Sequence, residues 1–417
     1  MYKSILFFIF LFPIALFGQN LKSTEVRFGA AKVNITPEVP IPMSGYSNRE
    51  KPFTEVHDDL FASALCFSNI NTKVLIITAD VISFNNILAS EIKQKIEDKT
   101  GIPGENIFLT AAHNHGGPVI KAYEKDVSEE VEKYVDILQD KLVEIAAQAA
   151  SQTVPVQIGY GSGSCSLNIN RRAKFSDGSV WLGRNQDGPC DHEVSVLKIE
   201  NENGKLLSLF VNWPCHGTAS GQDNLEITGD WPGLAARYLN KKLGEDVIIA
   251  VTAGASGDIN PIYGPNNNFR EIEAVGTQLG AEVFRTLSEI ETSPVYSIDI
   301  TNKTLTLPGK KSGKGRYSKD IIEKGPDVDV NLSVCKIGNY VLSGISGEVM
   351  TEIGMNIKAA SDYSRTMVIT HCNGTSGYIC TDAAYPEGGY EVNVTRLWPG
   401  SEKEITQNVV EMINTLN

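Results

Sequence analysis

Two histidines, His113 and His115, stand one residue apart directly after an apolar segment. Residues 107–112 read Ile-Phe-Leu-Thr-Ala-Ala, which is typical of a buried strand, and Gly-Gly-Pro follows the second histidine. Because alternate side chains of a strand share a face, this pattern predicts that both imidazoles point into one site at the strand end. A third histidine, His216, follows another apolar segment, and the chain has only six. Neutral imidazole is the commonest zinc ligand; ordinary polar packing is the alternative for an H-x-H pair alone.

Oxygen-bearing side chains follow two further apolar segments. Glu348 comes after residues 340–345, and Tyr378 comes after residues 366–370. Two histidines, a carboxylate and one more oxygen ligand would form a zinc site of the catalytic type, which keeps room for a water molecule. Taken alone, Glu348 is typical of a charge at a helix start, and Tyr378 is typical of a half-buried core aromatic.

A glycine-rich loop and a pair of arginines are further candidates. The loop at residues 254–261 has no G-x-S-x-G or G-x-G-x-x-G spacing and no P-loop lysine, which excludes those three motifs. It is interpreted as a tight turn that approaches a ligand. Of Arg171 and Arg172, one could orient an anionic or polar group of a substrate, with surface charge as the alternative.

Strands and helices alternate along the chain. Strands at 73–80 and 107–112 on either side of a helix at 86–100 form a β-α-β unit, which implies a parallel pair. Further strands are predicted at 156–160, 193–200, 206–213, 247–252, 295–307, 340–345 and 366–370. Further helices are predicted at 127–150, 233–243, 271–290, from 347, and at 401–416. The predicted fold class is therefore α/β: one large domain with a mixed sheet flanked by helices and the site at the carboxyl ends of strands. The stretch 308–315 is predicted to be a flexible loop.

The N-terminus predicts export. Lys3, a short apolar run at 5–17 and a small-residue exit are typical of a secretory signal peptide, with an uncleaved anchor as the alternative. The expected organisation is a signal peptide at 1–19 and a catalytic domain at 20–417, in a secreted or periplasmic protein. The formal net charge of −13 argues against a nucleic acid partner, so a small-molecule substrate is expected.

Six short motifs, in this order, resemble those of the catalytic domain of neutral ceramidases. They are Ala-Ala-His-Asn-His-Gly-Gly-Pro (111–118), Asn-Ile-Asn-Arg (168–171), Cys-His-Gly-Thr (215–218), Gly-Asp-Ile-Asn-Pro (257–261), Gly-Glu-Val-Met (347–350) and Gly-Tyr-Ile-Cys-Thr (377–381), the last followed by Tyr-Glu at 390–391. The opening at 30–37 and the segment that begins at His57 also fit the family's pattern.

The resemblance implies a Zn²⁺ cofactor and a zinc-bound water that attacks an amide carbonyl. The four zinc ligands that it implies are His113, His216, Glu348 and Tyr378. It further implies that His115 transfers protons beside the metal and that Arg171 lies in the site. Tyr390 would help to stabilise the tetrahedral oxyanion. A rival fold with an H-x-H pair, the amidohydrolase barrel, would need a bridging lysine and further histidines, and His371 is the only spare histidine near a strand end.

The sequence departs from the family pattern at two points. Asn260 stands where ceramidases carry the serine of Gly-Asp-Val-Ser-Pro; asparagine cannot be an acyl nucleophile, but it can hydrogen-bond a substrate. The domain at 20–417 is also expected to lack the C-terminal immunoglobulin-like domain that ceramidases usually carry.

The leading hypothesis is a secreted zinc hydrolase of a linear amide of the ceramide type. A lipid substrate of that kind would bring the protein into peripheral contact with a membrane. One alternative is a zinc-dependent enzyme of the same fold that acts on a carbohydrate-derived or other polar substrate. The other is a non-catalytic homologue.

Overall fold

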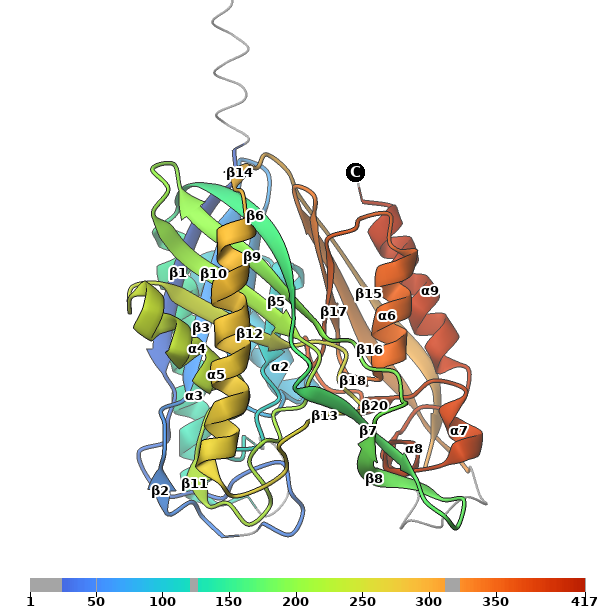
Figure 1. The fold of residues 1–417 in the computed structure, drawn as a ribbon. Coiled ribbons are helices and arrows are strands. Elements are labelled where there is room, and N and C mark those ends of the chain that lie inside the picture. Colours follow the sequence, from blue (N-terminus) through green and yellow to red (C-terminus); the bar gives the residue numbers. More distant parts are fainter. Residues whose placement is uncertain (1–24, 50, 121–126, 312–322, 417) are drawn as a thin grey trace, which may run out of the picture.

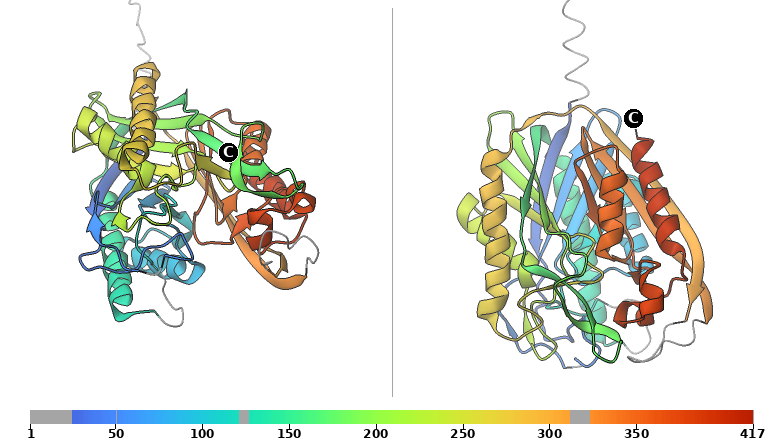
Figure 2. Two further views of the ribbon diagram at one scale, coloured as in Figure 1. Left: turned by 60° about the horizontal axis from the view of Figure 1, so that its bottom comes forward. Right: turned by 45° about the vertical axis from the view of Figure 1, so that its right-hand side comes forward.

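Two β-sheets lie face to face, and helices cover their outer sides (Figure 1, Figure 2). The computed structural model describes residues 25–49, 51–120, 127–311 and 323–416. The predicted α/β class with a large mixed sheet is confirmed, although a second sheet joins it. The predicted signal peptide at 1–19 falls outside the described residues. In the ranges described, no helix combines the length and the apolar character that a membrane span requires.

The larger sheet is mixed, with order β12-β10-β9-β6-β1-β3-β4-β5 and β14 paired to β6. Its β4 and β5 pair in parallel, as the β-α-β pattern predicts, and β10 and β12 form a second parallel pair. Its strands are β1 (Arg27–Asn34), β3 (Phe61–Ser68), β4 (Lys73–Ala79), β5 (Ile107–Ala111), β6 (Val154–Ser164), β9 (Glu193–Asn201), β10 (Leu206–Trp213), β12 (Ile248–Ala253) and β14 (Ser293–Pro294).

The second sheet has four strands in the order β15-β16-β17-β19. They are β15 (Ile298–Lys310), β16 (Lys324–Ile337), β17 (Tyr340–Ile345) and β19 (Thr366–Ile369). The predicted loop at 308–315 is wrong in its first part, because β15 continues past a bulge at Leu307 and pairs Lys310 with Lys324 of β16. Residues 312–322 lie outside the described residues.

Short strands complete the sheets beside the candidate site. They are β2 (Glu55–Val56) with β11 (Glu226–Ile227), β7 (Asn168–Lys174) with β8 (Val180–Asn185) and β13 (Ile259–Pro261), and β18 (Glu348–Val349) with β20 (Tyr378–Ile379). The helix predicted to begin at Gly347 is wrong at its start: Glu348 pairs in parallel with Tyr378, and the helix begins at Thr351. Glu348 N donates to Gly377 O at 2.9 Å, so the backbone here belongs to a strand pair.

Helices pack on the outer sides of both sheets. They are α2 (Asn86–Thr100), α3 (Glu129–Ser151), α4 (Asp230–Leu243), α5 (Phe269–Thr286), α6 (Thr351–Ala360), α7 (Ala384–Glu387), α8 (Tyr390–Val394) and α9 (Ser401–Asn414), with 3-10 turns η1 (Gly104–Asn106) and η2 (Leu287–Glu289). The ends of α2 match its sequence signals: the Asn85 side chain accepts from Leu88 N at 2.8 Å, and Gly101 ends the helix with φ of 70°.

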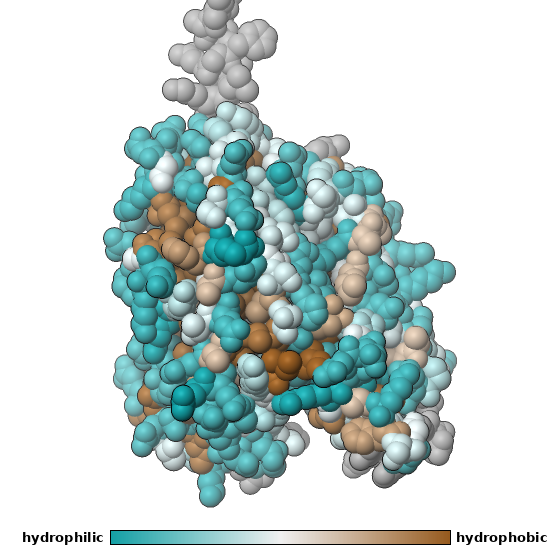
Figure 3. All heavy atoms as spheres, viewed as in Figure 1, coloured by the Kyte–Doolittle hydropathy of each residue, from teal (hydrophilic) through white to brown (hydrophobic). Residues whose placement is uncertain are grey.

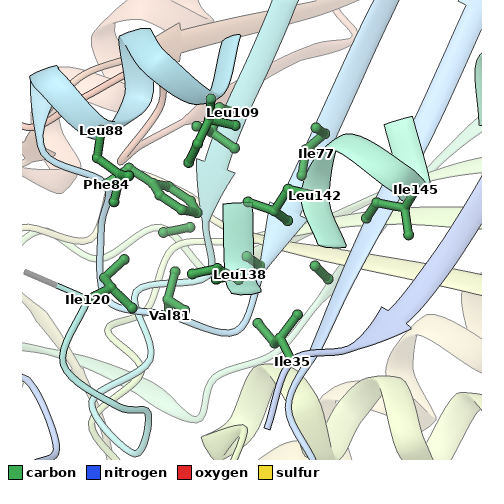
Figure 4. Close-up of a cluster of buried hydrophobic side chains, with 14 of the residues drawn as sticks. Ile35, Ile77, Val81, Phe84, Leu88, Leu109, Ile120, Leu138, Leu142 and Ile145 are labelled. Carbon is green, nitrogen blue, oxygen red and sulfur yellow. The ribbon is translucent and has the colours of Figure 1, made fainter. Parts of the chain in front are cut away.

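The period of two along β5 divides the core into layers. Leu109 points toward α2 and α3, into a cluster that includes Phe84 and Leu142 (Figure 4). Its neighbour Phe108 points the other way, into the layer between the two sheets, where it joins Leu342 of β17. The strands are therefore fixed on both faces, and their carboxyl ends form a rigid base for polar side chains.

Candidate metal centre

Segments that follow strands of both sheets bring the predicted ligands together. His113 follows β5 and His216 follows β10, both in the larger sheet. Glu348 follows β17 of the second sheet, and Tyr378 comes after β19. The site was predicted to lie at the carboxyl ends of strands, and this arrangement matches that prediction.

His113 and His115 meet in space, but not through alternation along a strand. β5 ends at Ala111, and His113 has a positive φ of 57°, a left-handed conformation that turns the chain. His115 N donates to Gly217 O at 2.9 Å, which fixes the turn against the loop that carries His216. The two Nε2 atoms lie 3.3 Å apart. The prediction of a shared site therefore holds, and its strand geometry is wrong.

The rings of His113 and His216 are oriented by backbone carbonyls. His113 Nδ1 lies 2.9 Å from Ile82 O, and His216 Nδ1 lies 2.6 Å from Ser256 O. A carbonyl only accepts, so each Nδ1 carries the proton and each Nε2 presents a lone pair to the centre. Burial lowers the pKa of His216 to about 3, which keeps that ring neutral.

Glu348 closes the centre opposite the two rings. Its Oε2 lies 3.5 Å from His113 Nε2 and 3.2 Å from His216 Nε2. Burial alone would raise the pKa of this carboxyl, but the neighbouring His113 and His216 hold it well below its usual value. The carboxylate oxygen thus faces the Nε2 atoms of both imidazoles.

These donors fit a zinc ion. The ligand atoms of three buried histidines, His113, His115 and His216, lie within 4.8 Å of one another, and the Glu348 carboxylate reaches two of them. Imidazole nitrogen and carboxylate oxygen are the ligands of catalytic zinc sites. Orphaned lone pairs that converge in a buried space are the arrangement that a cation would stabilise.

Tyr378 is tied to the centre by Arg171. The guanidinium of Arg171, from β7, places Nη2 3.0 Å from the Tyr378 hydroxyl and donates through Nε to Glu391 Oε1 at 2.7 Å. Glu391 is 1% exposed, and its other oxygen accepts from Arg172 Nη1 at 3.0 Å. Surface charge, the alternative considered for the two arginines, is therefore wrong for both, because they share one buried carboxylate. Glu391 was not singled out by its sequence motif.

Asn260 and Tyr390 lie at the more open side of the centre. Asn260 Oδ1 accepts from Arg171 Nη1 at 3.1 Å and from Thr218 Oγ1 at 3.3 Å. Both Asn260 and Tyr390 are half-buried, and the Tyr390 ring meets the Tyr378 ring edge to face at 5.8 Å. On this side of the centre an amide and a phenol offer hydrogen bonds.

The segment 43–49 packs on His115, and sequence motifs gave no signal for it. Tyr46 meets the His115 ring edge to face at 5.1 Å, and a Cβ on Gly45 would lie 2.4 Å from His115 Nδ1. Arg49 donates to the carbonyl oxygens of Ser44 and His115. His115 Nδ1 is buried and has no hydrogen-bond partner among the described residues. His115 therefore lacks the carbonyl anchor that the other two rings have.

His371 and Asp258 are two further neighbours. The His371 ring stacks on His113 with centroids 3.8 Å apart and an interplanar angle of 13°. Asp258 joins two elements, because its carboxylate accepts from Thr351 N at 2.8 Å and from Asn170 Nδ2 at 2.9 Å. The sequence had indicated His371 through its position beside a strand end. Asp258 lies within the loop motif at 254–261.

The sequence matches the model of one protein family. The model describes the N-terminal part of neutral/alkaline non-lysosomal ceramidases, and it matches residues 27–272, more than half of the chain. That range contains both histidines of the H-x-H pair, His216, Arg171 and Asn260. Glu348, Tyr378 and Tyr390 lie beyond it.

Individual relatives are similar over part of the chain. A neutral ceramidase of Pseudomonas aeruginosa is 25% identical over 292 residues, which cover 66% of this chain and 43% of that protein. A neutral ceramidase of Oryza sativa is 23% identical over 231 residues, which cover 52% of this chain and 29% of that protein. The matched part therefore spans less than half the length of these relatives.

Solved structures share the fold over nearly the whole chain. A crystal structure of neutral ceramidase from Pseudomonas aeruginosa superimposes with a TM-score of 0.79 at 19% identity, over 94% of this chain and 74% of that one. A structure of a ceramidase complexed with C2 gives the same TM-score at 18% identity, over 94% of this chain and 75% of that one. At these identities the likeness establishes the fold.

Proposed function

The chain belongs to the neutral/alkaline non-lysosomal ceramidase family, and from that premise we propose that it is a zinc-dependent hydrolase of an N-acyl amide bond in a ceramide-like substrate. The observation that carries this proposal is the convergence of two backbone-anchored imidazoles and one carboxylate on a single point. His113, His216, Glu348 and Tyr378 would hold the metal. A bound zinc ion supplies Lewis acidity and makes water a nucleophile near neutral pH.

His115 is the proposed proton-transfer residue. Burial, and then the neighbouring His113 and His216, lower its pKa well below the usual value, so the ring is neutral and has a nitrogen that can accept a proton. Its Nδ1 has no partner among the described residues, whereas the proposed ligand histidines have theirs occupied by carbonyls. This difference supports separate roles for the two members of the H-x-H pair.

Tyr390 is the proposed donor to the oxyanion. Its hydroxyl is half-buried beside Tyr378, and burial, followed by the charge of Glu348, raises its pKa. The phenol therefore keeps its proton at neutral pH and can donate it in a hydrogen bond to a developing negative charge. Arg171 positions this region, since its guanidinium lies 5.5 Å from the Tyr378 ring and 5.7 Å from the Tyr390 ring.

The location of the enzyme is part of the proposal. Export to the periplasm or the exterior rests on the sequence of residues 1–19. A lipid amide presented at a membrane surface would then be met by peripheral contact. The partner is a small molecule, which the net charge of −13 favours over a nucleic acid.

The test is release of fatty acid from a short-chain fluorescent ceramide by zinc-loaded protein of residues 20–417. Glu348→Gln removes the charge of a proposed ligand at nearly constant volume. We expect zinc content to fall and turnover to drop by at least about 100-fold. Glu352→Gln is the matched control, because Glu352 is exposed on α6 only four residues away, and it should behave as the wild type.

Unchanged zinc content and turnover in Glu348→Gln would contradict the ligand assignment. Zinc bound to the wild type at about one per chain, without turnover of any N-acyl amide, would contradict amide hydrolysis while keeping the metal centre. In that case the polar, carbohydrate-derived substrates considered above become the next to be assayed.

A further inference from the structure

Arg49 is a buried cation that has no anionic partner. Three arginines are buried among the described residues, and two of them, Arg171 and Arg172, pair with the carboxylate of Glu391. Arg49 is 6% exposed, and in the described part of the chain all its hydrogen bonds go to backbone carbonyls. A buried cation without an anionic partner is unfavourable, so an anion that reached Arg49 would be stabilised.

The guanidinium of Arg49 has donors to spare. Its Nη1 donates to Asn224 O at 3.2 Å, and its Nη2 donates to the carbonyl oxygens of Ser44 and His115. Its Nε is buried and has no hydrogen-bond partner among the described residues. A guanidinium carries N–H bonds beyond those in use here, one on Nη1 and one on Nε, which remain for another acceptor. Burial lowers the pKa of Arg49 to about 10, which leaves the group charged at neutral pH.

Arg49 lines a pocket of about 490 Å³. Of the described residues around this pocket, Arg49 is the only charged one. The hydroxyl-bearing side chains of Ser47, Ser83 and Thr375 also line it, and a hydroxyl can donate to an anion. The pocket therefore combines one cation with polar donors.

The pocket adjoins the candidate metal centre. Ile82 lines the pocket, and its carbonyl oxygen lies 2.9 Å from His113 Nδ1. Tyr46 also lines it and meets the His115 ring edge to face at 5.1 Å. Arg49 itself donates to the carbonyl of His115. A short linker would therefore connect a group bound at Arg49 with an amide held at the metal centre.

The rest of the molecule offers little attraction to an anion. The formal net charge is −13, and hydrophilic residues dominate the face seen in Figure 3. A protein of this charge repels a small anion at long range, so binding of an anion depends on a local cation. Burial keeps the charge of Arg49 from being screened by salt as an exposed charge would be.

We propose that the pocket at Arg49 is a subsite for an oxyanion, such as a sulfonate or a carboxylate, on the amine part of the substrate. This inference rests on the proposed function and names a class of substrate, an N-acyl amide with an anionic head group. In a lipid amide the acyl part is a hydrocarbon, so the charge belongs to the amine part. Hydrolysis would break the C–N bond, add the oxygen of water to the acyl carbon and a proton to the nitrogen, and release a fatty acid and an amine that keeps the anion.

The first experiment compares amides that differ in charge but hardly in shape. N-hexanoyl taurine ends in a sulfonate, and the N-hexanoyl amide of 2-(methylsulfonyl)ethylamine ends in a neutral sulfone. We expect zinc-loaded wild type to release hexanoate from the sulfonate with a kcat/KM at least about tenfold higher. N-hexanoyl β-alanine and its primary amide test a carboxylate in the same way, and the pair with the larger ratio identifies the preferred anion. Ratios near one for both pairs would overturn the subsite.

Variants of Arg49 assign the preference to its charge. Loss of the bonds to the carbonyls of Ser44 and His115 should lower the turnover of both members of a pair, whereas loss of the charge lowers their ratio. We expect a ratio of about one in Arg49→Gln and a ratio well above one in Arg49→Lys, which keeps the charge. Arg285→Gln is the matched control, because it removes a positive charge from the exposed surface of α5, and its ratio should equal that of wild type. A wild-type ratio in Arg49→Gln would overturn the inference.

A binding measurement keeps the inference separate from the proposed function. Octane-1-sulfonate and octyl methyl sulfone have no amide bond, so calorimetric titration of zinc-loaded protein measures binding alone. We expect the sulfonate to bind at least about tenfold more tightly to wild type and to lose this advantage in Arg49→Gln. Equal binding of the two probes to wild type, or binding of neither, would overturn the subsite whether or not the enzyme hydrolyses amides. A preference that depends on Arg49, without turnover of any amide, would support the subsite and contradict amide hydrolysis.

Discussion

At the scale of single residues, hydrogen bonds already engage one atom of each polar side chain in the centre. The remaining atom of each is the one that can bind a cation or a substrate. The carbonyls of Ile82 and Ser256 occupy the Nδ1 atoms of His113 and His216, which leaves only Nε2 for a cation. The same reasoning applies to Asn260, whose Oδ1 accepts from Arg171 and Thr218. Its amide nitrogen therefore points away from both, toward the half-exposed side, and offers two donors to a substrate.

Asn260→Asp tests this orientation. The aspartate keeps the acceptor that faces Arg171 and Thr218, but it replaces the outward donor with an acceptor. We expect kcat/KM on a short-chain amide to fall by about 10- to 100-fold, the cost of losing one hydrogen bond to a developing charge, while zinc content stays at the wild-type level. Steady-state kinetics and metal analysis of the same preparation measure both.

Asn260→Ser is the control for this prediction, because a hydroxyl can still donate. It should retain more activity than Asn260→Asp. If the aspartate variant matched the wild type, or if serine and aspartate were equally impaired, Asn260 would not be a donor to the substrate.

At the scale of elements, the segment 43–49 packs against His115 and holds its ring in place. Among the described residues, His115 Nδ1 has no hydrogen bond that would do so. Gly45 has a φ of 101° and lies against the imidazole, with room for no Cβ. We predict that Gly45→Ala displaces either the segment or the ring. It should lower both turnover and, by about 1–3 kcal/mol, the free energy of unfolding.

Gly101→Ala is the control that separates the effect of contact with His115 from the effect of a positive φ at the substituted residue. Gly101 also has a positive φ, of 70°, but nothing lies within 4 Å of an added Cβ. This variant should lose some stability and keep full turnover. Equal turnover in the two variants, measured at a temperature where both are folded, would show that contact with His115 has no role in the reaction.

Asp258 couples β7 to the start of α6, and this coupling predicts a pH effect. Burial raises its pKa from 3.8 to about 6, so the folded protein holds this proton more tightly than the unfolded chain does. The stabilisation is present below about pH 4 and is lost as the pH rises through about 6, by up to about 3 kcal/mol. Asp258→Asn should lack this dependence, so its Tm relative to wild type should rise between pH 4 and pH 7.

Thermal unfolding of chelator-treated protein measures this difference without a contribution from metal binding. Glu352→Gln, exposed on α6, should follow the wild type across the same range. A difference in Tm between Asp258→Asn and wild type that stayed constant with pH would contradict burial of an ionisable group at this junction.

The elements themselves were predictable where the local signal and the tertiary environment agree. The predicted helix at 86–100 and the strand at 340–345 match α2 and β17, because capping residues mark the one and a continuous apolar run marks the other. Among the longer strands, β1, β7, β8 and β16 were missed. The segment 168–174 contains Arg171 and Arg172, whose burial depends on Glu391, more than two hundred residues away. A sequence pattern around residues 168–174 therefore cannot indicate that these arginines pair with Glu391.

The candidate site was predictable as a set of residues, but not as a geometry. The order of motifs named His113, His216 and Glu348, and the structure brings them together. The turn at His113 depends on a left-handed backbone held by the His216 loop, and Glu348 sits in a strand pair formed with Tyr378. Both features arise from contacts between distant segments, which spacing along the chain does not encode.

At the scale of the whole molecule, the centre is a junction between the two sheets. His113 and His216 extend from β5 and β10 of the larger sheet, while Glu348 extends from β17 of the second sheet. The apolar layer that joins the sheets contains Phe108, on β5, and Leu342, on β17. A cation bound by these side chains would therefore add a polar link at one end of an interface that is otherwise held by hydrophobic packing.

Removal of the metal should consequently loosen both sheets at this end. A ligand that binds only the folded state stabilises it by about 2.7 kcal/mol at a free concentration of 100 times Kd, so chelation should lower Tm and added zinc should restore it. Hydrogen exchange should quicken at the carboxyl ends of β5 and β17 together, although the two strands belong to different sheets. Glu348→Gln, which lacks one proposed ligand, should show faster exchange at both ends before chelation and little further change after it. If chelation affected only the end of β5, the metal would be bound by histidines of the larger sheet alone, and Glu348 would not link the sheets.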